Sequence, residues 1–180
     1  MEVFWSKGYE GAQLVDLTKA MGISPPSFYA AFGTKEEAFC EAVDLYIRTV
    51  GAHPMQALER ARTLKAGLRT MLERSIDVAL SSDTRGCMLI LGVVNVLPET
   101  SGACAYLKNA RRTTHALLEK RIRRAVEEGE LSPDSNPAAL ADFYHGILQA
   151  ISFQARDGAT RAQLRRLIVP ALAAIANDAK

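Results

Sequence analysis

Residues 14–39 read LVDLTKAMGISPPSFYAAFGTKEEAF, and this stretch decides the fold. Its apolar residues recur every three or four positions, which is the spacing of an amphipathic helix. Gly22 and Gly33 interrupt the pattern at points where a helix can end in the left-handed conformation. The sequence therefore predicts a short helix over 13–21, a second short helix over 25–31, and a longer third helix directly after them.

The second and third of these helices begin with clear capping signals. Ser24 can act as the N-cap, and Pro25 takes the first helical position, where its missing N–H costs nothing. Because Pro26 also lacks a donor, the Ser24 hydroxyl can cap only through the amide of Ser27. The run TKEE at 34–37 has the pattern of a capping box. The arrangement is typical of a helix-turn-helix, whose second helix lies in the DNA major groove, although an ordinary three-helix packing also fits it.

The rest of the chain also has helical periodicity. No stretch of strict alternation is long enough to indicate a strand, so the predicted fold class is all-α. Glycine and proline breaks divide the remainder into about five or six longer helices. We expect an N-terminal helix-turn-helix unit over residues 1–50 and a larger helical body over residues 51–180.

Composition limits the classes of protein that the chain can be. The 180 residues are 48% hydrophobic and 23% charged, which is a globular profile. The longest apolar run, Met88 to Leu97, is about half of the ~20 residues that a membrane span needs. Because no signal sequence opens the chain, we expect a cytoplasmic protein without membrane contact.

The sequence offers no candidate for catalysis or for metal binding. We find no HExxH, GxSxG, GxGxxG or P-loop pattern, so we do not expect an enzyme. The three cysteines show no CxxC spacing, and the three histidines have no spacing that suggests a metal cluster. We therefore expect neither a metal nor another cofactor.

The run from Gly8 to Phe39 closely resembles the DNA-binding domain of the TetR family of bacterial transcriptional regulators. The resemblance implies a homodimeric, ligand-responsive repressor that binds a palindromic operator in double-stranded DNA. It also implies that the body holds a pocket for a small-molecule effector and that its last two helices form the dimer. The alternative is a helical interaction module that does not bind DNA.

When the DNA-contacting positions of the family are matched to this sequence, the resemblance implies a set of DNA-contacting residues. Tyr29 is expected to reach a backbone phosphate, and Lys35 matches the phosphate-contacting lysine of the family. Gln13 is expected to replace in part the hydroxyl residue that the family usually has at the position of Ala12, where it caps the helix and contacts a phosphate. The expected recognition surface comprises Ser24, Pro25, Pro26, Ser27 and Tyr29.

The same resemblance suggests that the N-terminal unit is shortened. Residues 1–5 match the last turns of the family's first helix, and an arginine-rich segment is expected to precede them. Residues 1–50 hold more Asp and Glu than Lys and Arg. Since phosphate neutralisation supplies most non-specific affinity, we expect this 180-residue polypeptide to bind DNA weakly.

The effector pocket is expected in the middle of the body, with Asn95 or His115 as polar groups. The alternative is that these residues simply pack together. Cys87 lies near a predicted helix start beside Arg85, where the pKa of a thiol can fall, and some relatives sense electrophiles or oxidants at a similar cysteine. The alternative for Cys87 is a small buried hydrophobic residue. The candidate lining residues are Met71, Cys87, Met88, Leu91, Val94, Asn95, His115 and Tyr144.

The last two predicted helices, over 137–157 and 160–177, carry apolar faces with small residues between them. Two such helices can form a four-helix bundle with the same pair of a second subunit. This pairing would set two recognition helices about one DNA turn, ~34 Å, apart. We interpret the basic run over 103–128 as a solvated helix face. The candidate dimer residues are Leu140, Phe143, Ile147, Ile151, Leu164, Leu167, Ile168, Leu172 and Ile175.

Overall fold

Every regular element of the computed structural model is a helix, in residues 1–83, 85–93 and 98–176, which the structure describes. The predicted all-α class is therefore confirmed. Within these described ranges, we find no helix with the length and apolar character that a bilayer crossing requires.

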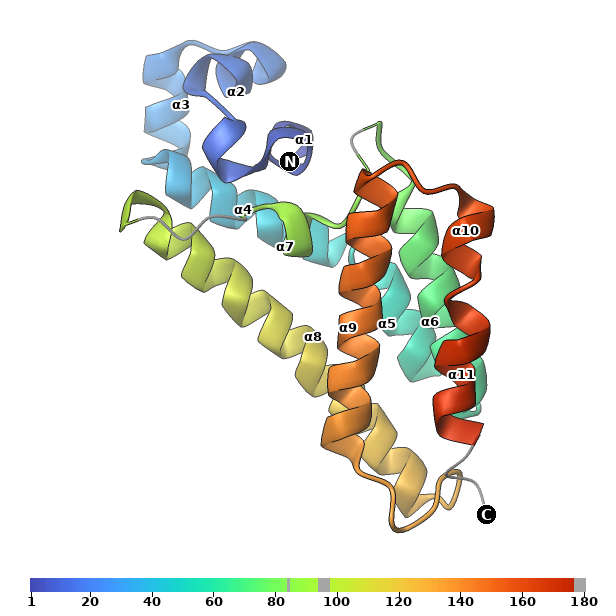
Figure 1. Ribbon diagram of the computed structural model, residues 1–180. Helices are drawn as coiled ribbons and strands as arrows, with labels where there is room; N and C mark the ends of the chain where they lie inside the picture. Colours follow the sequence, from blue (N-terminus) through green and yellow to red (C-terminus); the bar gives the residue numbers. More distant parts are fainter. Residues whose placement is uncertain (84, 94–97, 177–180) are drawn as a thin grey trace.

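The N-terminal helices form a separate lobe at one end of the molecule (Figure 1). We call this lobe the head, and it rests on α4, which leads from the head into the body (Figure 1). The helices of this part are α1 (Glu2–Gly11), α2 (Leu14–Met21), α3 (Pro25–Phe32) and α4 (Lys35–Arg48).

The body is built around two long helices, α8 and α9, which pack against each other; α6 packs on α9, and α5, α10 and α11 pack on α6 (Figure 1). Its elements are α5 (Ala52–Arg60), α6 (Leu64–Ala79), α7 (Met88–Leu91), the 3-10 turn η1 (Pro98–Thr100), α8 (Ser101–Glu127), α9 (Pro137–Arg156), α10 (Arg161–Arg165) and α11 (Ile168–Ala176).

The predicted caps of the head are present. The Ser27 amide donates to Ser24 Oγ at 3.3 Å, and the Glu37 amide donates to Thr34 Oγ1 at 3.0 Å. Gly22 has φ 67° and ψ 31°, the left-handed conformation that ends α2. Gln13 is the N-cap of α2, and its backbone N–H donates to Asp16 Oδ2 at 3.0 Å. The local signals thus set the boundaries of α2, α3 and α4.

Two predicted helices of the body differ from the structure. The apolar helix expected from Cys87 is a single turn, α7, and residues 94–97 lie outside the described ranges. The last predicted helix, from Thr160, is divided into α10 and α11. Pro170 lies in the first turn of α11, where its missing N–H is tolerated, whereas inside one continuous helix it would remove a hydrogen bond and clash.

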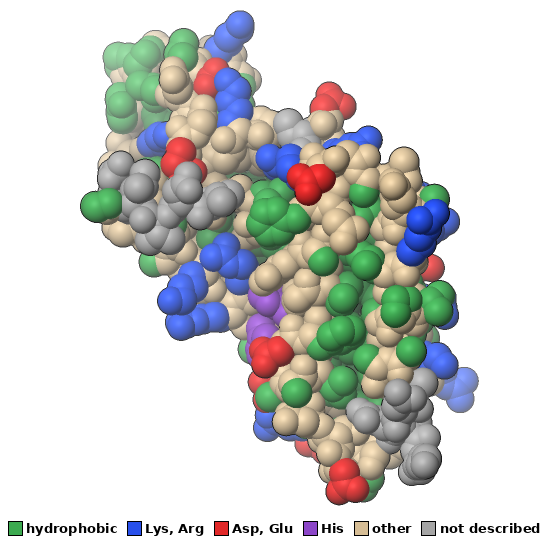
Figure 2. Space-filling model, in the orientation of Figure 1, with side chains coloured by type: hydrophobic (Ala, Val, Ile, Leu, Met, Phe, Trp, Pro, Cys, Tyr) green, Lys and Arg blue, Asp and Glu red, His purple; other side chains and the backbone are tan. Residues whose placement is uncertain are grey.

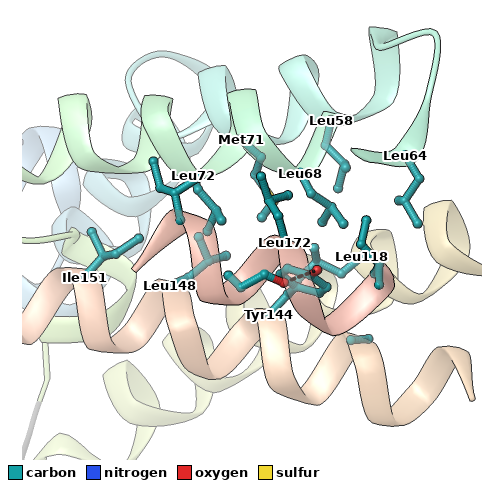
Figure 3. Close-up of a cluster of buried hydrophobic side chains, with 14 of the residues drawn as sticks. Leu58, Leu64, Leu68, Met71, Leu72, Leu118, Tyr144, Leu148, Ile151 and Leu172 are labelled. Atoms are coloured by element: carbon teal, nitrogen blue, oxygen red, sulfur yellow. Dashed lines mark hydrogen bonds between the residues drawn. The ribbon is translucent and has the colours of Figure 1, made fainter. Parts of the chain in front are cut away.

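Two clusters of buried hydrophobic side chains hold the fold together. The head cluster contains Phe4, Trp5, Phe28 and Phe39, and it continues into α7 and α8 through Met88, Ala103 and Leu107. The body cluster lies between α5, α6, α8, α9 and α11, and Figure 3 shows its side chains meeting between these helices. Because the head cluster includes α7, the head shares its core with the polypeptide that follows α6.

Candidate functional site

The surface of α3 is exposed, as a helix that enters a DNA groove must be. Tyr29 is 51% exposed, and the four residues from Ser24 to Ser27 are also exposed. Phe28 occupies the opposite side of the helix, where it is 0% exposed and lies 5.1 Å from Phe32 between ring centroids. One aromatic side chain therefore anchors α3 while its N-terminal turn and Tyr29 face solvent.

Lys35 is held beside the head by an aromatic ring. Its Nζ lies 4.6 Å from the centroid of the Tyr9 ring, a cation–π contact. Burial lowers the pKa of Lys35, and the nearby Glu10 opposes this shift. The side chain is half-buried at the start of α4, next to the head surface. Its contact with a phosphate stays a prediction.

The end of α1 is tied to the segment that follows α6. We call residues 86–92 the bridge segment. The Trp5 indole Nε1 donates to the Gly86 carbonyl at 2.8 Å, and the Tyr9 amide donates to the Gly92 carbonyl at 2.7 Å. Gly8 allows this geometry, because its φ of 70° with ψ 178° is accessible to almost no other residue. Both ends of the bridge segment are therefore hydrogen-bonded to the head.

The other side of the bridge segment lines an inner cavity between α4, α5, α6, α8 and α9. The cavity encloses about 70 Å³. Because small-molecule sites commonly measure about 300–1,000 Å³, its walls must move apart to admit a ligand. Apolar side chains dominate its lining. They include Pro54, Met55, Val78, Leu89, Ile90 and Leu148, with Tyr46, Ser75, Arg111, Thr114, His145 and Ser152 as polar members.

The cavity contains only part of the predicted effector set. Cys87 lines it. His115 does not, which corrects the prediction for this residue: its Nε2 lies 2.8 Å from Asp142 Oδ1, and its ring packs 5.8 Å from that of His145, which is part of the lining. Asn95 and Val94 lie outside the described residues. The remaining four residues do not line the cavity and are buried elsewhere, which corrects the prediction: Met71, Met88, Leu91 and Tyr144.

The buried positions of three of these four have simple causes. Met71 and Tyr144 belong to the body cluster, and the Tyr144 hydroxyl donates to the Ala171 carbonyl at 2.8 Å. Met88 belongs to the head cluster. A helical apolar pattern identifies buried side chains, but it does not separate those that line a cavity from those that fill a core.

The hypothesis of a low-pKa thiol at Cys87 is wrong. Burial raises the pKa of Cys87, and this effect exceeds the opposing hydrogen bond from the Tyr46 hydroxyl, which lies 3.2 Å from Sγ. Arg85 turns away, with φ 55°, and donates to the Ala159 carbonyl at 3.2 Å. Cys87 is therefore a protonated thiol in the cavity wall.

The structure corrects five of the nine predicted dimer residues. Ile151, Leu164, Ile168, Leu172 and Ile175 are each at most 5% exposed and pack inside their own subunit. Phe143 is 41% exposed, and Leu140, Ile147 and Leu167 are half-buried. Phe153 and Val169, which the sequence analysis did not name, are 47% and 72% exposed. Hydrophobic side chains extend along this face in Figure 2.

Among the described residues, no group of three or more His, Cys, Asp or Glu side chains could hold a metal ion. Sequence analysis also missed Tyr46, Arg111 and His145 as cavity residues. A signal for Arg111 was available, because residues 107, 111, 114 and 118 are spaced by three or four positions along one helix face. Leu107 and Leu118 on that face are both 0% exposed, which points Arg111 inward.

Family models match both parts of the chain. Residues 1–42 match the model described as bacterial regulatory proteins, tetR family. Residues 64–169 match the model described as the C-terminal domain of tetracyclin repressor-like proteins. The second match alone spans more than half of the 180 residues.

Curated relatives are similar over most of their length. The chain is 29% identical over 169 residues to the HTH-type transcriptional repressor ComR of Escherichia coli (strain K12), covering 93% of this chain and 80% of ComR. It is 30% identical over 178 residues to the HTH-type transcriptional regulator UidR of the same strain, covering 93% of this chain and 86% of UidR.

Solved structures of this family superpose closely on the chain. A cysteine mutant of the TetR family regulator CifR, complexed with 26-base-pair double-strand operator DNA, is 37% identical with a TM-score of 0.91 and covers 96% of this chain and 91% of its own. A TetR regulator from Rhodococcus sp. RHA1 is 30% identical with a TM-score of 0.66, covering 97% and 94%. The chain therefore belongs to the TetR family and is a helix-turn-helix transcriptional regulator.

Proposed function

We propose that this regulator represses transcription as a homodimer that binds a palindromic operator through α3. A small molecule that enters the inner cavity releases the dimer from the operator. The observation that carries this proposal is the exposed N-terminal turn of α3, from Ser24 to Ser27, with Tyr29 beside it. A helix braced from behind by Phe28 can enter the major groove without unfolding the head.

The DNA-binding part of the proposal is supported by the CifR complex, in which a similar chain is bound to double-strand operator DNA. The residues proposed to face the operator are Gln13, Ser24, Pro25, Pro26, Ser27, Tyr29 and Lys35. Backbone-phosphate contacts by Tyr29 and Lys35 would set the orientation, and the α3 turn would reach base edges.

The effector part of the proposal is supported by the position of the bridge segment. Leu89 and Ile90 face the cavity, while Gly86 and Gly92 accept hydrogen bonds from the head. A ligand that repositions this segment therefore acts directly on α1. The equilibrium between operator-bound and free dimer shifts by the difference in ligand affinity between the two conformations.

The test is selection of operator sequences from random double-strand DNA by the purified chain at low salt. We expect enrichment of a palindrome whose half-sites are about one helical turn apart. A mobility-shift titration with the enriched sequence and a scrambled copy then measures specificity. Recovery of no preferred sequence would favour the alternative, a helical interaction module without DNA binding.

The dimer part of the proposal predicts an effect of Phe143→Arg. Phe143 and Val169 are exposed and Ile147 is half-buried on α9 and α11, where a second copy would cover this apolar face. Because a charge buried in that interface is unpaired, the dimer dissociation constant should rise at least about tenfold. Sedimentation velocity measures this change.

The matched control is Leu117→Arg, at a residue that is 46% exposed on α8 and lines a surface hollow with Ile47 of α4 and Met55 of α5. We expect it to leave the dimer unchanged. A Phe143→Arg protein that dimerises as tightly as the wild type would contradict the placement of the interface.

A further inference from the structure

Arg111 brings a positive charge to a cavity whose lining is mainly apolar. Its Nη1 donates to the Leu89 carbonyl at 2.7 Å. Among the described residues, none of the ion pairs between basic and acidic side chains involves Arg111. A half-buried guanidinium without a carboxylate partner is costly, because its lost hydration is only partly replaced.

The other polar groups of the cavity do not supply a negative charge. Burial lowers the pKa of His145, and the neighbouring His115 and Arg111 shift it in the same direction, so its imidazole is neutral at pH 7. Tyr46 stays protonated, because burial raises its pKa, and its hydroxyl donates a hydrogen bond to Cys87 Sγ. Burial also lowers the pKa of Arg111, yet a guanidinium stays charged near neutral pH. The cavity therefore carries a net positive charge.

We propose that the effector is a small amphipathic anion, with a carboxylate that pairs with Arg111 and an apolar portion that lies against Met55, Val78 and Leu148. This inference rests on the proposed function, because it names the class of ligand for the same cavity. The planar guanidinium fork matches a carboxylate with two parallel hydrogen bonds. Apolar side chains from α5, α6 and α9 provide the rest of the surface.

The position of Arg111 also links the anion to the head. Arg111 supports the Leu89 carbonyl in the middle of the bridge segment. A carboxylate competes for the same donor group. The Leu89 carbonyl then loses this partner, in the segment whose two ends hold Trp5 and Tyr9 of α1. Binding of the anion thereby changes the support of the DNA-binding head.

The probes are straight-chain carboxylates of about four to about twelve carbons and the primary alcohols of equal length. Calorimetry measures their affinity, and the fluorescence of Trp5, the one tryptophan of the chain, reports on the bridge segment. We expect the carboxylate of the best length to bind at least about tenfold more tightly than its alcohol. Equal affinities, or no binding by any carboxylate in the series, would overturn the proposal.

Variants test whether Arg111 itself, and not the overall positive charge nearby, causes the preference for a carboxylate. Arg111→Gln keeps a donor for the Leu89 carbonyl but removes the charge, so the preference for carboxylate should fall to within about twofold. Arg111→Lys should retain part of it. The control is Arg112→Gln, at the exposed neighbouring residue, which should bind like the wild type. A preference that survives in Arg111→Gln, or that is lost equally in Arg112→Gln, contradicts the inference.

A mobility-shift assay on the same samples distinguishes the ligand class from the repressor mechanism. If carboxylate binding depends on Arg111 but leaves operator affinity unchanged, the ligand class stands and the release mechanism fails. If the wild type binds its operator but shows no carboxylate preference, the ligand class is wrong and DNA binding stands.

Discussion

A Ser27→Glu variant is expected to bind operator DNA at least about 100-fold more weakly than the wild type, because juxtaposed like charges at an interface cost several kcal/mol. Ser27 is exposed in the first turn of α3, on the surface proposed to enter the groove. A carboxylate at this position would face the DNA phosphates, and a dimer would carry two such carboxylates, one in each subunit. Folding should not suffer, since an acidic side chain in the first turn of a helix is favourable.

The matched control is Ala66→Glu, which adds the same charge in the equivalent helical position elsewhere. The Ala66 amide donates to Thr63 Oγ1 at 3.3 Å, as the Ser27 amide donates to Ser24 Oγ at 3.3 Å. Ala66 is exposed at the start of α6, which lies at the opposite end of the molecule from α3 (Figure 1). Mobility-shift titrations at low salt compare the three proteins, with circular dichroism to verify folding.

We expect Ala66→Glu to bind DNA like the wild type. If Ser27→Glu remains within about threefold of the wild type, a carboxylate at this position does not meet the phosphates, and α3 is not the helix that reads the operator.

The head could be predicted in detail because its boundaries depend on local chemistry. Gly22 ends α2 in the left-handed conformation, and the hydroxyls of Ser24 and Thr34 cap the next two helices. Each of these signals acts within four residues along the chain. No knowledge of distant packing is needed to place α2, α3 and α4.

The body could be predicted only in outline, because an apolar helix face does not reveal its partner. Ile151, Leu164 and Leu172 were assigned to a second subunit, yet they pack within their own. The proposed dimer face keeps Phe143, which the sequence analysis named, and adds Val169, which periodicity alone does not distinguish from its buried neighbours. One helix can carry two apolar faces, and tertiary packing decides which of them is buried within the subunit.

The cavity was the least predictable feature, since its polar residues come from separate helices. Tyr46, Arg111 and His145 are contributed by α4, α8 and α9. Arg111 was hidden in a basic run that is otherwise mostly exposed. Proximity along the chain was also misleading at Cys87, because the backbone of Arg85 directs that residue to the loop after α9.

Replacing Arg121 with methionine is expected to lower the free energy of unfolding by about 3 kcal/mol, because it leaves a carboxylate without its counter-charge. Arg121 is 1% exposed, and its Nη2 lies 2.9 Å from Glu130 Oε1. The other oxygen of Glu130 accepts a hydrogen bond from the Leu64 amide. The pair thus joins α8, the turn after it and the start of α6. Urea denaturation measures the change.

The double variant Arg121→Met with Glu130→Gln separates charge from packing. Glutamine keeps an acceptor for the Leu64 amide but needs no counter-charge, so most of the lost stability should return. Two further nitrogens of Arg121, Nε and Nη1, have no hydrogen-bond partner among the described residues, so an apolar side chain there loses little else.

Arg123→Met is the control for this pair, since the contact of Arg123 with Glu119 is exposed and should contribute at most about 1 kcal/mol. A double variant that is as unstable as Arg121→Met alone would show that the arginine stabilises the body by filling space. In that case the packing between α6 and α8 depends on shape complementarity at Arg121. Replacing Glu130 would then have no further effect on stability once Arg121 is absent.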